Sequence, residues 1–246
     1  MLSELWNSSP ENRFYMIVML SYLPIMIFSI FVSYGVNSSF NKYSGVRLRC
    51  GLTADQIARQ IMNSNGVYYP IVKIRGSLTD NFNPETETVS LSSTVYGSTS
   101  VAAAGVACHE IGHALQYATK YPLITFRSKL VPVVNFANKL LGPMIIIGCI
   151  FGLFTAYGAV GNIFVYAGLI LFGLSMLFSL VTLPIELDAS RRALKALSDG
   201  GYVEGDEKAM AKSVLRAAAL TYLAGLLVST WQFMRFLAIF LMRNRD

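Results

Sequence analysis

Four long runs of apolar residues divide this sequence, and each is long enough to cross a lipid bilayer as a helix. They cover residues 14–34, 140–157, 163–185 and 217–242, the last interrupted by a single arginine. Charged residues make up 14% of the chain, whereas in soluble domains they are about a quarter. The sequence therefore predicts a mainly α-helical integral membrane protein with about four transmembrane helices. The first span is expected to be a retained anchor with a kink at Pro24, and 217–242 is expected to be the C-terminal transmembrane helix.

The lengths of the connecting segments set how these spans are arranged. Residues 158–162 are an uncharged turn, too short for anything but an antiparallel helical hairpin over 140–185. With four spans, the segments 37–139 and 186–216 then lie on the same side of the membrane. Most Lys and Arg residues belong to that side, which favours the cytoplasm, although the basic C-terminal tail ends on the other side. We expect a multi-pass protein of the cell membrane whose two polar segments face the cytoplasm.

The excess of basic over acidic residues does not indicate a nucleic-acid partner. The formal net charge is +6, but basic residues that flank membrane spans account for such an excess. The sequence also lacks a cluster of basic and aromatic residues that would favour nucleic-acid binding. The expected partner is therefore the lipid bilayer.

Segment 37–139 has the mixed polar and apolar pattern of a small α/β unit. Thr53 and Gln56 have capping-box spacing and open an amphipathic helix with Ile57 and Ile61 on its apolar side. The other expected elements are a strand over 67–74, a loop over 76–84, a half-buried strand over 87–92 and an amphipathic surface stretch over 121–139. The strand over 87–92 is a candidate sheet edge, which could bind an extended peptide by strand addition or only cover the core.

The two histidines of the chain stand four residues apart, with a glutamate directly after the first, in an expected helix over 100–117. Positions i and i+4 of an α-helix share one face, so His109 and His113 can reach one metal ion. Glu110 lies beside them, where its carboxylate can touch a water molecule held by that metal. Two histidine ligands and a glutamate base are the pattern of zinc peptidases. The alternative is a pair of core histidines, which explains the intervening glutamate less well; Cys108 is expected to be a packing residue.

A catalytic zinc ion needs three protein ligands and an open position for water, so the motif is incomplete by itself. The chain has no third histidine. A carboxylate at the edge of an apolar helix is costly unless it is partnered or functional; Asp188 has Arg192 at i+4, whereas Glu186 has no basic residue there. The topology also places Glu186 on the side of the histidines. We therefore predict Glu186, on the helix and loop over 186–216, as the third ligand. The alternative is that its charge stays in water at the membrane interface, with Asp188 and Asp80 as the next candidates.

Five blocks of the sequence form a specific set by their order and spacing. They are residues 76–80, 91–92 with 95–96, 106–114, 182–194 and 217–222. In these blocks the chain resembles the YugP-like family of membrane zinc metallopeptidases, small multi-span bacterial proteins, across nearly its whole length. The resemblance implies zinc-dependent peptide hydrolysis at a membrane surface by a zincin-like catalytic part over 37–139. It implies His109 and His113 as ligands and Glu110 as the base.

The chain is also distantly similar to the HtpX-type proteases, whose third zinc ligand is a glutamate on a later helix. Glu186 matches that role. Those proteases carry an aspartate four residues after the glutamate, where this chain has Ser190, so Ser190 or Asp188 is expected to support the ligands through hydrogen bonds. In the YugP-like family a histidine follows in the loop after Asp80; here residues 81–83 are Asn-Phe-Asn. No loop histidine contributes, and Asp80 is a further supporting candidate.

Together these features predict a membrane-embedded, zinc-dependent endopeptidase with one Zn²⁺ ion per chain and a peptide or membrane-protein substrate. Glu110 would accept a proton from the attacking water and hand it to the leaving amine. An oxyanion donor is also expected, with Arg191, Tyr202 and Tyr222 as candidates. The alternative is a non-catalytic, zinc-stabilised membrane scaffold or adaptor protein. Glu110 distinguishes the two functions, because a structural zinc site needs no acid there and is closed by four ligands.

Overall fold

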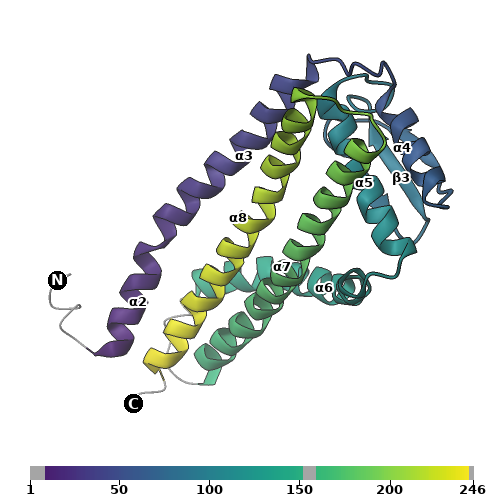
Figure 1. Ribbon diagram of the computed structural model, residues 1–246. Helices are drawn as coiled ribbons and strands as arrows, with labels where there is room; N and C mark the ends of the chain where they lie inside the picture. The colour runs from purple at the N-terminus through teal and green to yellow at the C-terminus, as the bar shows by residue number, and fades with distance from the viewer. Residues whose placement is uncertain (1–8, 152–158, 244–246) are drawn as a thin grey trace. The chain divides into compact units, whose positions relative to one another are not determined.

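The computed structural model describes residues 9–151 and 159–243, and it is mainly helical (Figure 1). The helices are α2 (Pro10–Leu20), α3 (Tyr22–Ser44), α4 (Ala54–Ser64), α5 (Val101–Ala118), α6 (Pro122–Ile150), α7 (Ala159–Asp199) and α8 (Asp206–Arg243). The strands are β1 (Ile71–Ile74), β2 (Asn81–Asn83) and β3 (Thr88–Ser92). The predicted fold class, mainly helical with a small sheet, is confirmed. The end of the predicted span over 140–157, Gly158 at the start of the predicted turn and the end of the basic tail lie outside the described residues.

Four helical stretches are long and apolar enough to cross a membrane, as predicted. They are Pro10–Ser44, which comprises α2 and α3, Pro122–Gly148, Ala159–Asp199 and Asp206–Arg243. Large apolar side chains stand on their outer surfaces; Leu23, Ile30 and Phe31 of α3 are 64%, 63% and 70% exposed. Exposed apolar side chains on helices of this length and composition are typical of membrane spans. The chain is therefore a membrane protein.

The first apolar stretch is interrupted close to the position predicted for a kink. α2 ends at Leu20 and α3 begins at Tyr22, so Ser21 separates the two helices. Pro24 follows in the first turn of α3, where it has no N–H to donate and its ring crowds the carbonyl group of Leu20. The kink predicted at Pro24 is thus a short break just before it.

The predicted boundary between a surface stretch over 121–139 and a span that starts at residue 140 is wrong. Both belong to one helix, α6, which begins at Pro122. Proline is favoured at the first position of a helix, because its missing N–H would have no partner there. Pro132 and Pro143 lie inside α6, and membrane helices tolerate such residues.

α7 is a single helix that continues through Pro184, beyond the end of the apolar run. Residues 159–162, predicted as part of a turn, form its beginning. After Pro184 the buried side chains recur every four residues, at Ile185, Ala189, Ala193 and Leu197. This spacing is that of one helix face, so the segment after the apolar run remains helical because that face packs into a core. The helix ends before Gly201, whose φ of +66° is the left-handed conformation that often terminates helices.

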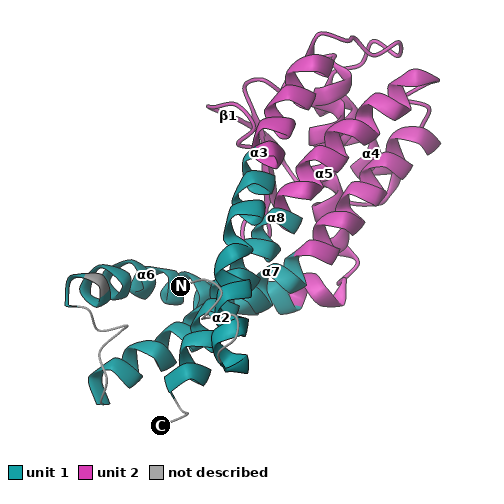
Figure 2. Ribbon diagram, turned by 90° about the vertical axis from the view of Figure 1, so that its left-hand side faces the viewer, with its two compact units in different colours: residues 1–30, 126–182, 223–246 teal, residues 31–125, 183–222 magenta. Residues whose placement is uncertain are grey.

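The described residues form two compact units (Figure 2). The unit drawn in magenta in Figure 2 comprises Phe31–Thr125 and Leu183–Tyr222, and the other described residues form the unit drawn in teal. The magenta unit contains the whole sheet, α4 and α5. Its core includes the almost inaccessible side chains of Ile57, Met62, Leu91 and Ile111. Every residue of the candidate site described below lies in this unit, which we call the core unit.

The sheet of the core unit has three strands in the order β1-β3-β2, with β1 parallel and β2 antiparallel to β3. Val89 of β3 pairs with Ile71 of β1 on one side and with Phe82 of β2 on the other. β3 is thus the central strand, and its Val89 and Leu91 are fully buried. Of the two alternatives for 87–92, the sheet edge open to strand addition is therefore wrong, whereas a strand that belongs to the core agrees with the structure.

The two outer strands also differ from the prediction. β1 begins only at Ile71, directly after Pro70, which has no N–H to give to a neighbouring strand. β2 occupies only Asn81–Asn83, inside the segment 76–84 that was expected to be a loop. A strand of three residues is too short to show the alternation by which strands are recognised in a sequence.

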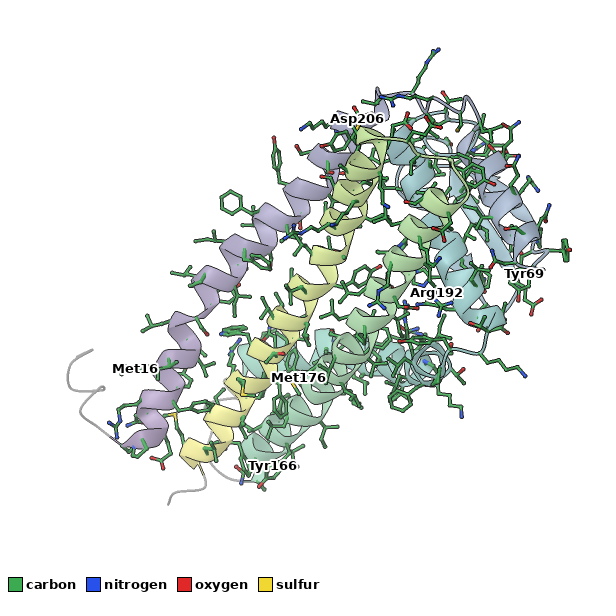
Figure 3. All side chains as sticks on the ribbon, in the orientation of Figure 1. Met16, Tyr69, Tyr166, Met176, Arg192 and Asp206 are labelled. Carbon is green, nitrogen blue, oxygen red and sulfur yellow. The ribbon has the colours of Figure 1, made fainter. Side chains whose placement is uncertain are left out.

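Two buried carboxylates fasten helix starts in the core unit. Asp55, in the first turn of α4, accepts a hydrogen bond from the backbone N–H of Gly97 at 3.0 Å. Glu207, in the first turn of α8, accepts one from the backbone N–H of Arg49 at 2.8 Å. The Arg49 side chain also reaches Asp206 at 2.9 Å, the residue labelled at the start of α8 in Figure 3. The two contacts of Arg49 hold in place the beginning of α8, whose later residues line the candidate site described below.

Candidate metal centre

The helix that carries both histidines, α5, is almost entirely buried in the core unit. Its N-cap is Ser100, whose Oγ accepts a hydrogen bond from the backbone N–H of Ala103 at 3.2 Å. The helix predicted over 100–117 is thereby confirmed. His109 and His113 lie one turn apart on it, and His113 is 9% exposed. Cys108 is buried, and burial raises the pKa of its thiol, in keeping with the packing role predicted for it.

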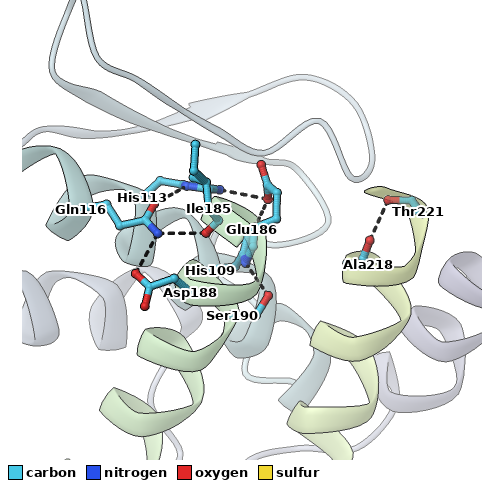
Figure 4. A network of polar contacts seen from close by, with 9 residues as sticks. All are labelled: His109, His113, Gln116, Ile185, Glu186, Asp188, Ser190, Ala218 and Thr221. Carbon is cyan, nitrogen blue, oxygen red and sulfur yellow. Dashed lines mark hydrogen bonds and ion pairs between the residues drawn. The ribbon is translucent and has the colours of Figure 1, made fainter. Parts of the chain in front are cut away.

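Glu186 of α7 meets both histidines of α5 (Figure 4). Its Oε2 lies 3.1 Å from Nε2 of His109 and 3.2 Å from Nε2 of His113. All three donor atoms lie within 4.8 Å of one another. Ligand atoms about 2.0–2.1 Å from a tetrahedral zinc ion are themselves about 3.3 Å apart. The three side chains predicted from the sequence are therefore brought together, and the two distances from Glu186 fit ligands of one zinc ion.

The chemistry of this cluster also suits a metal cation. Glu186 is only 1% exposed, and a buried carboxylate needs a compensating positive charge. Burial opposes protonation of His113, but the carboxylate of Glu186 raises the pKa of this histidine overall. Within residues 9–151 and 159–243, no further His, Cys, Asp or Glu joins the cluster. Three protein ligands leave one position of a tetrahedral ion open, as in catalytic zinc sites.

Gln116, three residues after His113, holds that histidine in place, a role that was not predicted from the sequence. It is fully buried. Its Nε2 donates to the backbone carbonyl of Ile185 at 2.9 Å and to Oδ2 of Asp188 at 3.0 Å. Its Oε1 is therefore the atom that faces Nδ1 of His113, at 3.0 Å, and Nδ1 must carry the hydrogen. This arrangement leaves Nε2 of His113 as the nitrogen turned toward Glu186, as second partners do for metal-binding histidines.

Ser190 occupies the corresponding position for the other histidine. Its Oγ lies 3.2 Å from Nδ1 of His109, so Nε2 of that ring also faces Glu186. Asp188 touches neither histidine; it accepts hydrogen bonds from Gln116 and, at 2.6 Å, from Nε of Arg192. The structure therefore places Ser190 next to a candidate ligand, whereas Asp188 reaches the site only through Gln116.

A glycine between the two histidines allows α7 to come close to α5. A Cβ atom built on Gly112 would lie 2.6 Å from the backbone oxygen of Ala189, which is too close for any other residue type without a shift of the backbone. Because Glu186 precedes Ala189 by one helical turn, this close contact brings its carboxylate within reach of both histidines.

Glu110 does not join the three-residue cluster but lines a pocket of about 200 Å³ together with His109. It is 8% exposed. Burial raises the pKa of Glu110, the two histidines lower it, and Glu186 and Asp80 raise it again. Asp80 lines the same pocket, but its carboxylate accepts hydrogen bonds from N–H and Oγ of Ser92 at 2.7 and 2.8 Å. Burial raises the pKa of Asp80, while the two hydrogen bonds from Ser92 lower it. Asp80 therefore holds its own loop in place and does not support a candidate ligand.

The three candidate oxyanion donors fall in different places. Tyr222 of α8 lines the pocket beside Glu110. The Arg191 side chain is 79% exposed and lies 3.9 Å from Asp188. Tyr202 packs against the hydrophobic core. Of the three, Tyr222 is the one that shares the pocket with the glutamate.

The sequence pattern of a known family covers almost the whole chain. The family is described as "Putative neutral zinc metallopeptidase", and its pattern matches residues 17–241. This chain belongs to that family. The resemblance inferred from the five sequence blocks is thereby confirmed, and the zinc that the metallopeptidase family implies suits the His109, His113 and Glu186 cluster.

A curated relative supports the same family membership. The "Putative membrane protease YugP" of Bacillus subtilis (strain 168) is 39% identical over 219 residues, which cover 89% of this chain and 93% of the relative. The membrane named in the description of this relative agrees with the four apolar helical stretches found here. No solved structure matches this chain.

Proposed function

We propose that this metallopeptidase is a membrane-embedded, zinc-dependent endopeptidase with one zinc ion per chain. His109, His113 and Glu186 would hold the ion, and Glu110 would act as the general base. The observation that carries the proposal is the placement of four largely buried polar side chains, of which three converge and the fourth does not. Three donor atoms converge within 4.8 Å of one another, while Glu110 stands apart from them on the wall of a pocket.

A zinc ion bound there would supply an activated water molecule and a Lewis acid for the peptide carbonyl. The carboxylate of Glu110 takes the proton of the attacking water and delivers it to the leaving amine. Its place beside His109 on the pocket wall supports this role. Tyr222 stands on the same pocket, where its hydroxyl can donate a hydrogen bond to the carbonyl oxygen as negative charge develops on it.

The test compares Glu110→Gln with Glu85→Gln, a change of the same kind at an exposed position. Zinc is measured by mass spectrometry in detergent-purified protein, and cleavage is measured on an unfolded protein substrate. We expect one zinc per chain in all three proteins, and a rate on the order of 10² to 10⁴ lower in Glu110→Gln alone. Full activity of Glu110→Gln would show that the proposed mechanism is wrong. Zinc without any cleavage by the natural chain would favour a scaffold or adaptor.

We also propose that the core unit faces the cytoplasm, because most Lys and Arg residues lie in the segments that form it. Cys50 is exposed and free, so it can report the orientation. In a Cys149→Ser background, a membrane-impermeant maleimide should label Cys50 in inverted vesicles and not in intact cells. Labelling in intact cells would reverse the orientation.

A further inference from the structure

The pocket beside Glu110 is apolar over most of its wall. Its wall includes Val36 and Phe40 of α3 and Val214, Leu215 and Ala218 of α8. Both helices belong to stretches that are apolar enough to cross a membrane.

Two polar side chains of this wall, those of Asp80 and Thr221, are already engaged in hydrogen bonds. Both carboxylate oxygens of Asp80 accept hydrogen bonds from Ser92. The hydroxyl of Thr221 donates to the backbone carbonyl of Ala218 at 2.6 Å (Figure 4). Apart from His109, Glu110 and Tyr222, the wall therefore offers mainly apolar surface to whatever enters.

The size of the pocket limits what it can hold. Its volume is about 200 Å³. An apolar cavity of about 150 Å³ holds a benzene molecule, whereas sites for whole drug-sized ligands are about 300–1,000 Å³. The pocket thus has room for one large aliphatic or aromatic side chain.

We propose that this pocket binds an apolar side chain of the peptide substrate, on a residue next to the bond that is cleaved. The inference rests on the proposed peptidase function. The pocket shares His109 and Glu110 with the candidate catalytic site, so its occupant must belong to a residue beside the reacting carbonyl group. Peptide segments rich in Leu, Ile, Met or Phe are then the substrate class, and aspartate at this position is disfavoured because the pocket wall already carries the carboxylates of Asp80 and Glu110.

The test uses peptides that are identical except for one residue, either Leu or Gly, with the cleaved bond mapped by mass spectrometry. One methylene group in an apolar pocket changes kcat/KM on the order of 10- to 200-fold, and the Leu side chain is larger than that. We expect the natural chain to favour the Leu peptide over the Gly peptide by at least this factor. Ala218→Phe should fill the pocket and bring the ratio close to one, and the smaller change Ala218→Leu should give an intermediate ratio.

Ala217→Phe is the matched control, because residue 217 is half-buried like Ala218, precedes it in α8 and does not line the pocket. Its Leu-to-Gly ratio should equal that of the natural chain. Zinc content, measured on every variant, identifies any that has lost its fold. A natural chain that cleaves both peptides equally, or an Ala218→Phe ratio that stays high, overturns the pocket assignment and leaves the peptidase function standing.

A binding measurement separates failure of the pocket assignment from failure of the peptidase function. Fluorescence anisotropy of the labelled peptides is recorded on zinc-loaded Glu110→Gln, with and without Ala218→Phe. Tighter binding of the Leu peptide that Ala218→Phe removes supports the pocket, even if the natural chain cleaves neither peptide. Equal binding of the two peptides overturns it. Binding that is displaced by a fatty acid in proportion to its chain length would assign the pocket to lipid and also overturn the proposal.

Discussion

The amide oxygen of Gln116 lies 3.0 Å from Nδ1 of His113, and the amide nitrogen of the same side chain donates to the Ile185 carbonyl on α7. One buried side chain thus links the helix that carries the histidines to the helix that carries Glu186. It orients the imidazole ring and joins two segments that lie far apart in the sequence. The candidate site therefore depends on a neutral residue that contacts no metal itself.

Replacement of Gln116 should weaken zinc binding without removing any ligand. Gln116→Ala deletes the partner of Nδ1 and frees the ring of His113 to turn, and partners of this kind are worth about 10- to 100-fold in metal affinity. Competition with a fluorescent zinc chelator measures the change. Gln60→Ala, at an exposed position of α4, is the control and should bind zinc as the natural chain does. Equal affinities of the two variants would mean that packing alone orients His113.

Ser190 allows a test in both directions. Ser190→Ala removes the oxygen 3.2 Å from Nδ1 of His109 and should weaken zinc binding by less than Gln116→Ala does, because the hydroxyl is a weaker partner than a buried amide. Ser190→Asp places a carboxylate there, which raises the basicity of the ligand and should tighten zinc binding. The same chelator competition measures both. Tighter zinc binding by Ser190→Ala than by the natural chain would contradict the role given to the hydroxyl.

Gly112→Ala should separate α5 from α7. The added Cβ would lie 2.6 Å from the backbone oxygen of Ala189, and overpacking of this kind costs about 1–3 kcal/mol. Gly105→Ala is a control on the same helix, because the nearest atom to its Cβ, the backbone oxygen of Ala211, is 3.9 Å away. That control should be neutral or more stable by up to about 1 kcal/mol. Thermal unfolding in detergent and zinc content are the measurements, and a normal zinc content in Gly112→Ala would show that the two helices can adjust.

Loss of Glu186 should abolish stoichiometric zinc binding. Glu186→Gln leaves two imidazole ligands and removes the buried negative charge that favours the cation. We expect zinc to fall from one per chain to a small fraction of that, while Glu204→Gln, an exposed glutamate in the loop before α8, keeps the full amount. If zinc is retained, Asp188→Asn and Asp80→Asn in the same background will show which carboxylate replaces Glu186.

The parts of the site that could be predicted are those with a fixed local geometry or a strict chemical requirement. The spacing of His109 and His113 is a property of any α-helix. Glu186 could be identified because a zinc site needs a third ligand and because the topology of four spans places this residue on the side of the histidines. Neither argument requires knowledge of the packing.

Gln116 was missed because its role depends on packing. A glutamine at the end of an apolar helix has no distinctive pattern by itself, and the only signal is that a polar residue stands three positions after a ligand in a helix that is otherwise buried. Its partners Ile185 and Asp188 are about 70 residues away in the sequence. The pocket is unpredictable for the same reason, since its wall combines α3, α5, α8 and the loop before β2.

The error at β3 has a different cause. The alternation of Val89 and Leu91 correctly indicated a strand, but a strand is central or at the edge according to its neighbours. The neighbour that makes β3 central is β2, which has three residues. A pairing partner of this length contributes two or three ladder bonds and leaves almost no trace in the sequence.

His109 and Glu186 are separated by 77 residues of chain, and this separation sets an order of events during synthesis. At a translation rate of about 5–20 residues per second, the glutamate is made roughly 4–15 seconds after the histidine. During this interval the ribosome produces α6 and the apolar part of α7, so the nascent chain carries both histidines but not yet Glu186. The cluster can therefore be completed only after the intervening membrane helices have been made.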